Sequence, residues 1–228
     1  MVEFLFIDMD DTILDFKKAE AVAIRKTLAD FGVEPTDAIC DRYSYINQLH
    51  WEALERKEIT REQVLTGRFQ VLFGELGVAV DPQECAARYT QNLAQGDFVL
   101  PGAVDVLKAL QGKYKLYLAS NGTTWVQKAR IAGSGIGEYF DEIFISQEMG
   151  ANKPAPEFFA PCFAKIPNFD KVKALIVGDS LTSDILGGKN VGIATCWYNP
   201  RHKPKKMEIT PDYEIYQLSD LLDLLEKL

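Results

Sequence analysis

The distribution of apolar residues divides this chain into two kinds of segment. Five short runs are almost continuously apolar, which is the pattern of strands that a sheet buries on both faces. They are residues 3–7, 115–119, 142–146, 174–178 and 192–197. Helical periodicity separates the later runs and closes the chain, at residues 103–111, 123–132, 156–164, 183–187 and 218–228. This alternation predicts an α/β fold with a doubly wound, parallel sheet.

Residues 16–97 follow a different pattern, because they contain no convincing strand and are typical of four helices. Two of the expected helix starts are marked by their residues. Thr60 with Gln63 has the spacing of a capping box, and Asp81 precedes Pro82 as an N-cap precedes a proline at the first helical position.

We therefore expect two domains. Residues 1–15 and 98–228 should form the α/β core domain, and residues 16–97 should form an all-helical domain inserted after the first strand. The return to the core is marked by Pro101 and Gly102.

Composition narrows the possible partners. The 228 residues are 47% hydrophobic and 25% charged, as in ordinary soluble domains, and the net charge is −8. A nucleic acid polymer is disfavoured because the chain has no basic stripe, and the basic segment at residues 201–206 is better explained as a solvated loop. No apolar run is long enough to span a membrane, and the chain enters its first strand without a signal-peptide pattern, so we expect a cytoplasmic protein.

The four cysteines also fit a reducing compartment. They are widely spaced and form no Cys-x-x-Cys pair, and only two histidines accompany them. This composition disfavours a structural zinc site and predicts free, mostly buried thiols. Nothing in the pattern points to a particular oligomeric state.

Candidate chemistry begins where the first apolar run ends. Asp8, Asp10 and Asp11 lie within four positions there. Like charges this close repel each other, and such a cluster persists when a cation sits among its oxygens. Oxygen ligands alone favour Mg²⁺, and ligands of open α/β sheets bind at the carboxyl ends of strands. The segment predicts a magnesium site, with a solvated acidic turn as the alternative.

A second segment, Ser120, Asn121 and Gly122, follows another apolar run and opens a helix. Unpaired amides at a helix start suit an anion, and the Ser120 hydroxyl could add a donor. A plain N-cap turn is the alternative. Further along, Lys153 precedes Pro154 and could place one positive charge beside a phosphate, although most lysines are solvated surface residues.

The last segment ends the fourth apolar run in Gly178 and Asp179, and Asp184 follows in the first turn of a helix. The glycine permits tight passage of the backbone. The two acids can face a common metal from the strand end and the helix start. Alternatively, Asp184 is only a favourable charge at a helix N-terminus.

Taken in this order, the motifs resemble the haloacid dehalogenase superfamily of phosphohydrolases over the whole chain. They are Asp-x-Asp-x-Thr at residues 8–12, Ser120, Lys153-Pro154, and Gly-Asp-Ser-x-x-x-Asp at residues 178–184. The resemblance implies a Rossmann-like core, and the helical insertion matches the superfamily's cap domain.

Within the superfamily the chain is similar to the pyrimidine 5′-nucleotidase branch. This closer likeness is carried by residues 49–52, 67–69, 120–122 and 194–199. Asp11 departs from the superfamily pattern, since many relatives have glycine there, but the change is common in this branch.

The resemblance implies a Mg²⁺-dependent phosphomonoesterase that acts through an aspartyl-phosphate on a small phosphorylated metabolite, here a nucleoside monophosphate. Asp8 would be the nucleophile and Asp10 the general acid and base. Mg²⁺ would be held by Asp8, the Asp10 carbonyl and Asp179, while Asp184 would orient metal-bound water or Lys153. The residues that would hold the phosphoryl group are Lys153, Ser120, Asn121 and Gly122.

Thr12 would brace the loop by a hydroxyl hydrogen bond. In the insertion, Phe16, Trp51, Arg68 and Phe69 are candidates for contact with the base or ribose, although aromatic residues on amphipathic helices are more often core.

Four alternative functions differ from this one in features that the sequence shows. A haloacid dehalogenase proper needs no Mg²⁺ and would leave the second acid without a use. A phosphatase or phosphomutase for a small sugar phosphate shares the core and differs in its cap. A receiver-like aspartate switch is about half this length and lacks the insertion. Glycines at residues 133–137 follow a helix and miss the GxGxxG spacing, which argues against dinucleotide binding.

Overall fold

The computed structural model describes residues 1–204 and 209–228. Two lysines of the basic segment, Lys205 and Lys206, lie outside the described residues. The chain folds as two compact units: a core unit of Met1–Asp15 and Val99–Leu228, and a helical unit of Phe16–Phe98. The predicted insertion was residues 16–97.

The core unit is built on one sheet of six parallel strands in the order β3-β2-β1-β4-β5-β6. The strands are β1 (Phe4–Ile7), β2 (Lys115–Ser120), β3 (Glu142–Ile145), β4 (Ala174–Gly178), β5 (Ala194–Tyr198) and β6 (Tyr213–Ile215). The α/β prediction is confirmed, and the five expected strands occur within two residues of their predicted bounds. The edge strand β6 was missed because it has only three residues, too few to show a period.

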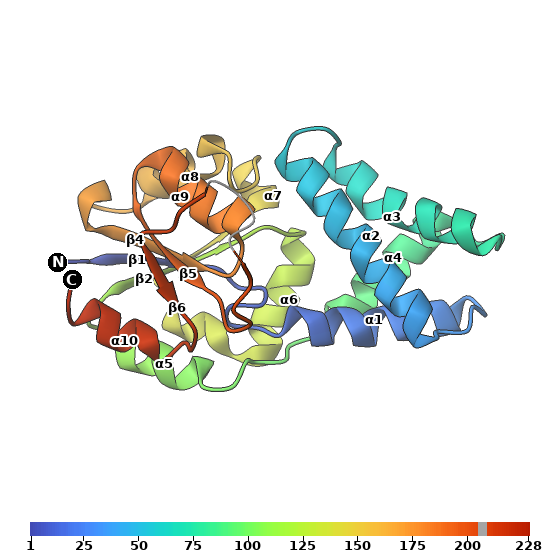
Figure 1. The fold of residues 1–228 in the computed structure, drawn as a ribbon, viewed down its shortest axis with the longest axis horizontal. Coiled ribbons are helices and arrows are strands. Elements are labelled where there is room, and N and C mark those ends of the chain that lie inside the picture. The colour runs from blue at the N-terminus through green and yellow to red at the C-terminus, as the bar shows by residue number, and fades with distance from the viewer. Residues whose placement is uncertain (205–208) are drawn as a thin grey trace. The chain divides into compact units, whose positions relative to one another are not determined.

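Helices cover both faces of the sheet (Figure 1). Alternate residues of the strands point to opposite faces, so Leu5 and Ile7 contribute to one apolar core while Phe4 and Phe6 contribute to the other. The first core is closed by α5 (Ala103–Leu110), α6 (Thr124–Ser134) and α10 (Asp220–Leu225). The second is closed mainly by α8 (Pro156–Lys165) and α9 (Leu186–Val191).

Short helical turns connect several of these elements. They are 3₁₀ turns at Ile136–Tyr139 and Lys171–Lys173, a single α-turn α7 (Ser146–Met149), and a π-helical turn at Leu181–Ile185.

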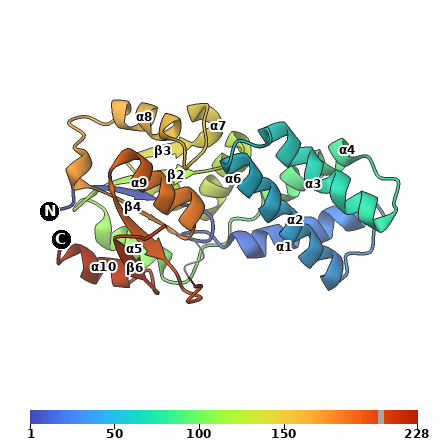
Figure 2. The same ribbon diagram turned by 45° about the horizontal axis from the view of Figure 1, so that its top comes forward.

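The helical unit consists of four helices that pack against one another (Figure 2). They are α1 (Phe16–Asp30), α2 (Asp37–Glu55), α3 (Arg61–Leu76) and α4 (Pro82–Leu93). The predicted capping box is present, because Thr60 accepts from the Gln63 amide while the Gln63 side chain accepts from the Thr60 amide. Asp81 caps α4 as predicted, accepting from the Gln83 amide at 2.7 Å. Local hydrogen bonds therefore set these two helix starts.

Two further expectations can be compared with the fold. All four cysteines are buried and free, which confirms the prediction of unpaired thiols. Among the described residues, none of the helices combines the length and apolar character that crossing a bilayer would demand.

The order of the strands positions the chemistry. The central strand β1 lies between β2 and β4, and Ile7 is level with Leu118 of β2 and Val177 of β4. The chain extends the sheet to one side of β1 through β2 and β3, and to the other side through β4, β5 and β6. Ligands bind at such a switch point, beyond the carboxyl ends of the strands.

Candidate active site

Asp8 lies at the centre of this switch point, directly after β1. Its amide donates to the Val177 carbonyl at 2.9 Å, which continues the pairing with β4 by one residue. One carboxylate oxygen, Oδ2, accepts from the Thr12 hydroxyl at 3.2 Å. The residue is only 7% exposed, so its carboxylate is held in a fixed direction and largely out of water.

Lys153 connects Asp8 with Asp184. Its ammonium donates to Asp8 Oδ1 at 2.7 Å, to Asp184 Oδ1 at 2.6 Å and to the Ala119 carbonyl at 2.5 Å. All three ammonium hydrogens therefore have an acceptor. Burial lowers the pKa of Lys153, but the two carboxylates outweigh burial and leave that pKa above its ordinary value. The two carboxylates thus favour the charged form of this buried lysine beside Asp8.

Three carboxylates converge here. Asp8, Asp179 and Asp184 each offer an oxygen, and these oxygens lie within 4.8 Å of one another. Burial, followed by the Asp184 charge, raises the pKa of Asp8 well above its usual value against the opposing effect of Lys153. Burial also raises the pKa of Asp179 to about 7, with contributions from Asp11 and Asp184 and opposition from Lys203.

Both shifts come first from burial and then from neighbouring carboxylates, so a cation among the three acids would favour their ionised forms. Oxygen ligands of this kind suit a hard divalent cation, so the donor set fits Mg²⁺.

A π-helical turn brings Asp184 into this group. Ser180 precedes the turn and its hydroxyl accepts from the Ser183 amide at 3.1 Å. The Ser180 amide donates to Asp184 Oδ2 at 3.1 Å, which turns the carboxylate back toward β4. A Cβ at Gly178 would lie 2.2 Å from the same Oδ2, so only glycine leaves room for this approach. Wide turns of this type are frequent at functional sites.

The segment after β2 forms a second part of the site. Ser120 is fully buried, and its hydroxyl accepts from Gln127 Nε2 at 2.8 Å. The Asn121 side chain holds the backbone of Lys153, since it accepts from the Lys153 amide and donates to the Lys153 carbonyl, both at 2.9 Å. The Gly122 amide donates to the Ser146 hydroxyl at 3.0 Å. Asn121 and Gly122 thus have partners within the protein. In the register of β1 with β2, Asp8 is level with Ala119, so Ser120 lies one residue further along its strand.

Asp10 has partners that the sequence analysis did not identify. Arg130 donates to Asp10 Oδ1 at 2.6 Å, and Gln127 donates to Asp10 Oδ2 at 2.9 Å. Both partners lie on α6, three residues apart, and both are buried. The sequence contains one signal for this contact: Arg130 is a charged residue that shares the apolar face of a predicted helix with Val126 and Ile131.

Asp11 has a conformational explanation. Its φ is 57°, in the left-handed region that glycine adopts freely and aspartate tolerates better than most residues. Its amide donates to the Leu14 carbonyl at 2.8 Å, closing the loop after β1. The turn geometry therefore accounts for glycine or aspartate at this position.

The four candidates in the helical unit differ in exposure. Phe16 and Trp51 are partly exposed. Phe69 is fully buried and packs on Tyr43 with ring centroids 5.2 Å apart, so it belongs to the interior of the helical unit. Arg68 is 2% exposed and donates to Asn47 Oδ1 at 2.7 Å. The core interpretation therefore describes Arg68 and Phe69 better than contact with a ligand.

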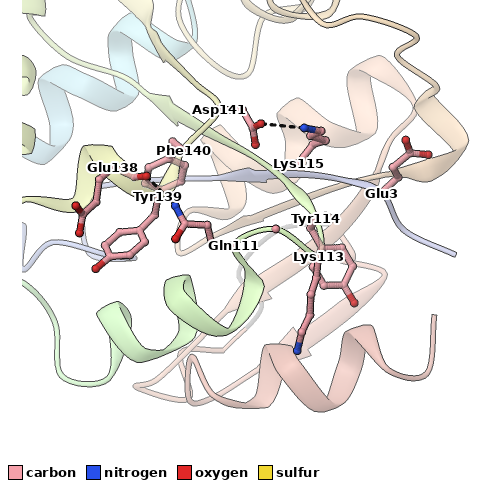
Figure 3. Close-up of a pocket in the computed structure, with 10 residues that line it drawn as sticks. Glu3, Gln111, Lys113, Tyr114, Lys115, Glu138, Tyr139, Phe140 and Asp141 are labelled. Carbon is pink, nitrogen blue, oxygen red and sulfur yellow. Dashed lines mark hydrogen bonds and ion pairs between the residues drawn. The ribbon is translucent and has the colours of Figure 1, made fainter.

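A separate cavity of about 390 Å³ lies at the opposite end of the strands, where they begin (Figure 3). It is lined by residues that precede or begin strands, including Glu3, Lys115 and Asp141. Lys115 pairs with Asp141 at 3.2 Å, and Gln111 donates to the Glu138 carbonyl at 2.8 Å (Figure 3). The cavity contains none of the predicted site residues.

Comparison with known proteins agrees with this geometry. A family model of haloacid dehalogenase-like hydrolases matches residues 2–192. The chain is 42% identical over 226 residues to the pyrimidine 5′-nucleotidase PynA of Streptococcus pneumoniae (strain ATCC BAA-255 / R6), covering 99% of this chain and 95% of that protein. It is 32% identical over 225 residues to the pyrimidine 5′-nucleotidase YjjG of Escherichia coli (strain K12), covering 99% and 98%.

A solved structure is also similar. The HAD-hydrolase YfnB from Bacillus subtilis, bound to magnesium, superposes with a TM-score of 0.94 at 40% identity, covering 98% of each chain. The resemblance to the superfamily and to its pyrimidine 5′-nucleotidase branch is confirmed. Since the family model spans most of the sequence and the relatives align over nearly all of it, this chain belongs to the haloacid dehalogenase-like hydrolases.

Proposed function

We propose that this protein is a Mg²⁺-dependent phosphomonoesterase that dephosphorylates pyrimidine nucleoside monophosphates through an aspartyl-phosphate on Asp8. The observation that carries the proposal is the surrounding of Asp8. One of its oxygens accepts from Lys153 at 2.7 Å, and its carboxylate belongs to the group formed with Asp179 and Asp184. A nucleophile for an anionic phosphate requires this concentration of positive charge and metal ligands.

In the first step, a carboxylate oxygen of Asp8 attacks phosphorus. The new bond joins that oxygen to phosphorus, the bond from phosphorus to the 5′-oxygen breaks, and Asp10 gives its proton to the departing oxygen. In the second step, water attacks phosphorus, the bond to Asp8 breaks, and the water proton passes to Asp10. Proton transfer of this kind typically contributes about 10²–10⁴-fold to the rate.

Mg²⁺ would be held by Asp8 and Asp179, with the Asp10 carbonyl and Asp184 beside it. When bound, the ion supplies two positive charges that offset the repulsion between a carboxylate and a phosphate. Lys153 adds one more charge at 2.7 Å from Asp8. The Ser120 hydroxyl would donate to a phosphoryl oxygen, and Asn121 would act by holding Lys153 through two hydrogen bonds of 2.9 Å. Gly122 would contribute its backbone to the same turn.

The substrate proposal rests on the relatives and on the helical unit. PynA and YjjG are pyrimidine 5′-nucleotidases and align with nearly all of this chain. Phe16 and Trp51 are partly exposed aromatic residues of the helical unit, and we propose that they contact the base or ribose. Arg68 and Phe69 would act indirectly, by stabilising that unit.

A panel of phosphate esters tests this proposal. We expect phosphate release from dUMP, dTMP and UMP to exceed release from AMP and from common sugar phosphates. Preference for a sugar phosphate would replace the nucleotide proposal with the second candidate, a metabolite phosphatase on the same core. A long-lived phosphoprotein without turnover would favour an aspartate switch instead.

The nucleophile is tested by Asp8→Asn. Phosphate release should fall to background while the circular dichroism spectrum stays unchanged, because the carboxamide keeps the shape of the side chain and has no anionic oxygen to attack phosphorus. The exposed Asp223 on α10 provides the control, and Asp223→Asn should retain wild-type activity. Substantial activity in Asp8→Asn would remove Asp8 from the nucleophilic role.

A further inference from the structure

Four side chains form a closed network at the start of α6. Gln127 Nε2 donates to Asp10 Oδ2 at 2.9 Å and to the Ser120 hydroxyl at 2.8 Å. Arg130 donates to Asp10 Oδ1 at 2.6 Å and to Gln127 Oε1 at 3.0 Å. Both carboxylate oxygens of Asp10 therefore accept from α6, and Gln127 connects them with Ser120.

Stability alone does not explain why Gln127 and Arg130 are buried. Gln127 is 3% exposed and Arg130 is fully buried. Removing a guanidinium from water is costly, and an ion pair with such a buried partner often contributes little net stability in return. Such a pair does fix the orientation of the carboxylate, because two donors in fixed positions hold both of its oxygens in place.

The network is separate from the one around the nucleophile. The Asp8 carboxylate accepts hydrogen bonds from Lys153 and Thr12, neither of which lies on α6. A change in Gln127 or Arg130 therefore reaches Asp10 directly and leaves the partners of Asp8 in place.

We infer that Gln127 and Arg130 are positioning residues that set the direction of the Asp10 carboxyl group, with Gln127 linking that direction to the hydroxyl of Ser120. The inference rests on the proposed function, in which Asp10 moves a proton in both steps. Without the two α6 donors, Asp10 can rotate, so proton transfer to the leaving oxygen and from the attacking water becomes slower. The attack of Asp8 on phosphorus is unaffected where the leaving group needs no proton.

The test compares two leaving groups in the full-length protein with Mg²⁺. A nucleoside monophosphate has an alkoxide leaving group that needs a proton, whereas p-nitrophenyl phosphate has a leaving group that departs as the anion. The variants are Gln127→Ala and Arg130→Met, with Asp10→Asn as the reference. Lys128→Met is the matched control, since Lys128 lies on the same helix with its side chain 60% exposed and paired to Glu148.

For the nucleotide, we expect kcat of both variants to fall about 10–100-fold with KM within about 3-fold, because part of the proton-transfer contribution is lost. For p-nitrophenyl phosphate, we expect a burst of one nitrophenolate per enzyme molecule, then slow turnover, since the second step still needs Asp10. Asp10→Asn should show the same two signatures, and Lys128→Met should show neither. Arg130→Lys should recover part of the activity, because it keeps the charge and loses the planar fork.

Nucleotide turnover at the wild-type rate in Gln127→Ala and Arg130→Met would overturn the inference. The inference would also be overturned if the nitrophenolate burst decreased by the same factor as nucleotide turnover. A distorted site would slow both reactions in this way. If Arg130→Met does not fold, as judged by circular dichroism, Gln127→Ala alone decides between these results. Failure of the wild-type protein to release phosphate from any ester would instead refute the proposed function, before the variants are compared.

Discussion

Replacing Asp179 by asparagine should stabilise the metal-free protein, although it removes a proposed ligand of Mg²⁺. Burial raises the pKa of Asp179 to about 7, with help from Asp11 and Asp184 and opposition from Lys203. In an unfolded chain the pKa of an aspartate is about 3.9. Because the folded value is the higher one, the group favours folding fully below about pH 4, and this contribution is lost as the pH rises to about 7.

The size of the effect follows from that difference. About 3 pH units correspond to about 4 kcal/mol at 1.36 kcal/mol per unit. The side chain of Asp179 is 21% exposed, so solvent screens part of the charge. We expect asparagine to relieve about 2 kcal/mol above pH 7, which raises Tm by roughly 4–8 °C for a chain of this size.

Thermal unfolding in EDTA at pH 8 and at pH 5 measures this difference, and the gain in Asp179→Asn should be smaller at pH 5. Saturating Mg²⁺ at pH 8 should raise Tm of the wild-type protein more than Tm of the variant, because the ion binds the folded state. A variant less stable than wild type in EDTA at pH 8 would refute the argument that Asp179 is a destabilising charge.

Asp212 provides a control, because its charge should affect stability in the opposite direction from that of Asp179. Burial raises the pKa of Asp212, but hydrogen bonds from Lys189 and Thr195 outweigh burial and leave that pKa below its ordinary value. Its carboxylate therefore stabilises the fold above the unfolded pKa. We expect Asp212→Asn to lower Tm at pH 8, with no change in the response to Mg²⁺.

Three further predictions concern the metal, the turn after β4 and the helical unit. EDTA should abolish phosphate release and Mg²⁺ should restore it; activity that survives thorough chelation would contradict a metal-dependent reaction. Gly178→Ala should lower activity and destabilise by about 1–3 kcal/mol in urea titration, because the new Cβ would lie 2.2 Å from Asp184 Oδ2, whereas Gly74→Ala, with nothing within 4 Å, should not. Arg68→Met should lower stability by about 2 kcal/mol through the lost bond to Asn47 and leave the order of preferred substrates unchanged; a switch in substrate preference without a stability loss would return Arg68 to the specificity residues.

Much of the candidate site could be predicted because its residues are marked locally. Asp8, Asp10, Ser120 and Asp179 each follow an apolar run, and a strand's carboxyl end is recognisable from sequence alone. The capping box of Thr60 is equally local, since its partner is three residues away. Such features depend on neighbours in the chain, so they can be recognised before the fold is known.

Other features depend on residues that are remote in sequence. Arg130 meets Asp10 across 120 positions, and Asn121 holds Lys153 across 32. Nothing near Arg130 or Asn121 in the chain specifies these partners.

The amino-acid sequence by itself determined the alternation of strands and helices, the helical insertion and the acids at the strand ends, because periodicity and local hydrogen bonds encode them. Only the tertiary structure decided that β1 lies between β2 and β4, that Asp184 turns back over Gly178, and that Phe69 is interior. The physical reason is that these outcomes depend on which surfaces pack together, and packing is a property of the whole chain.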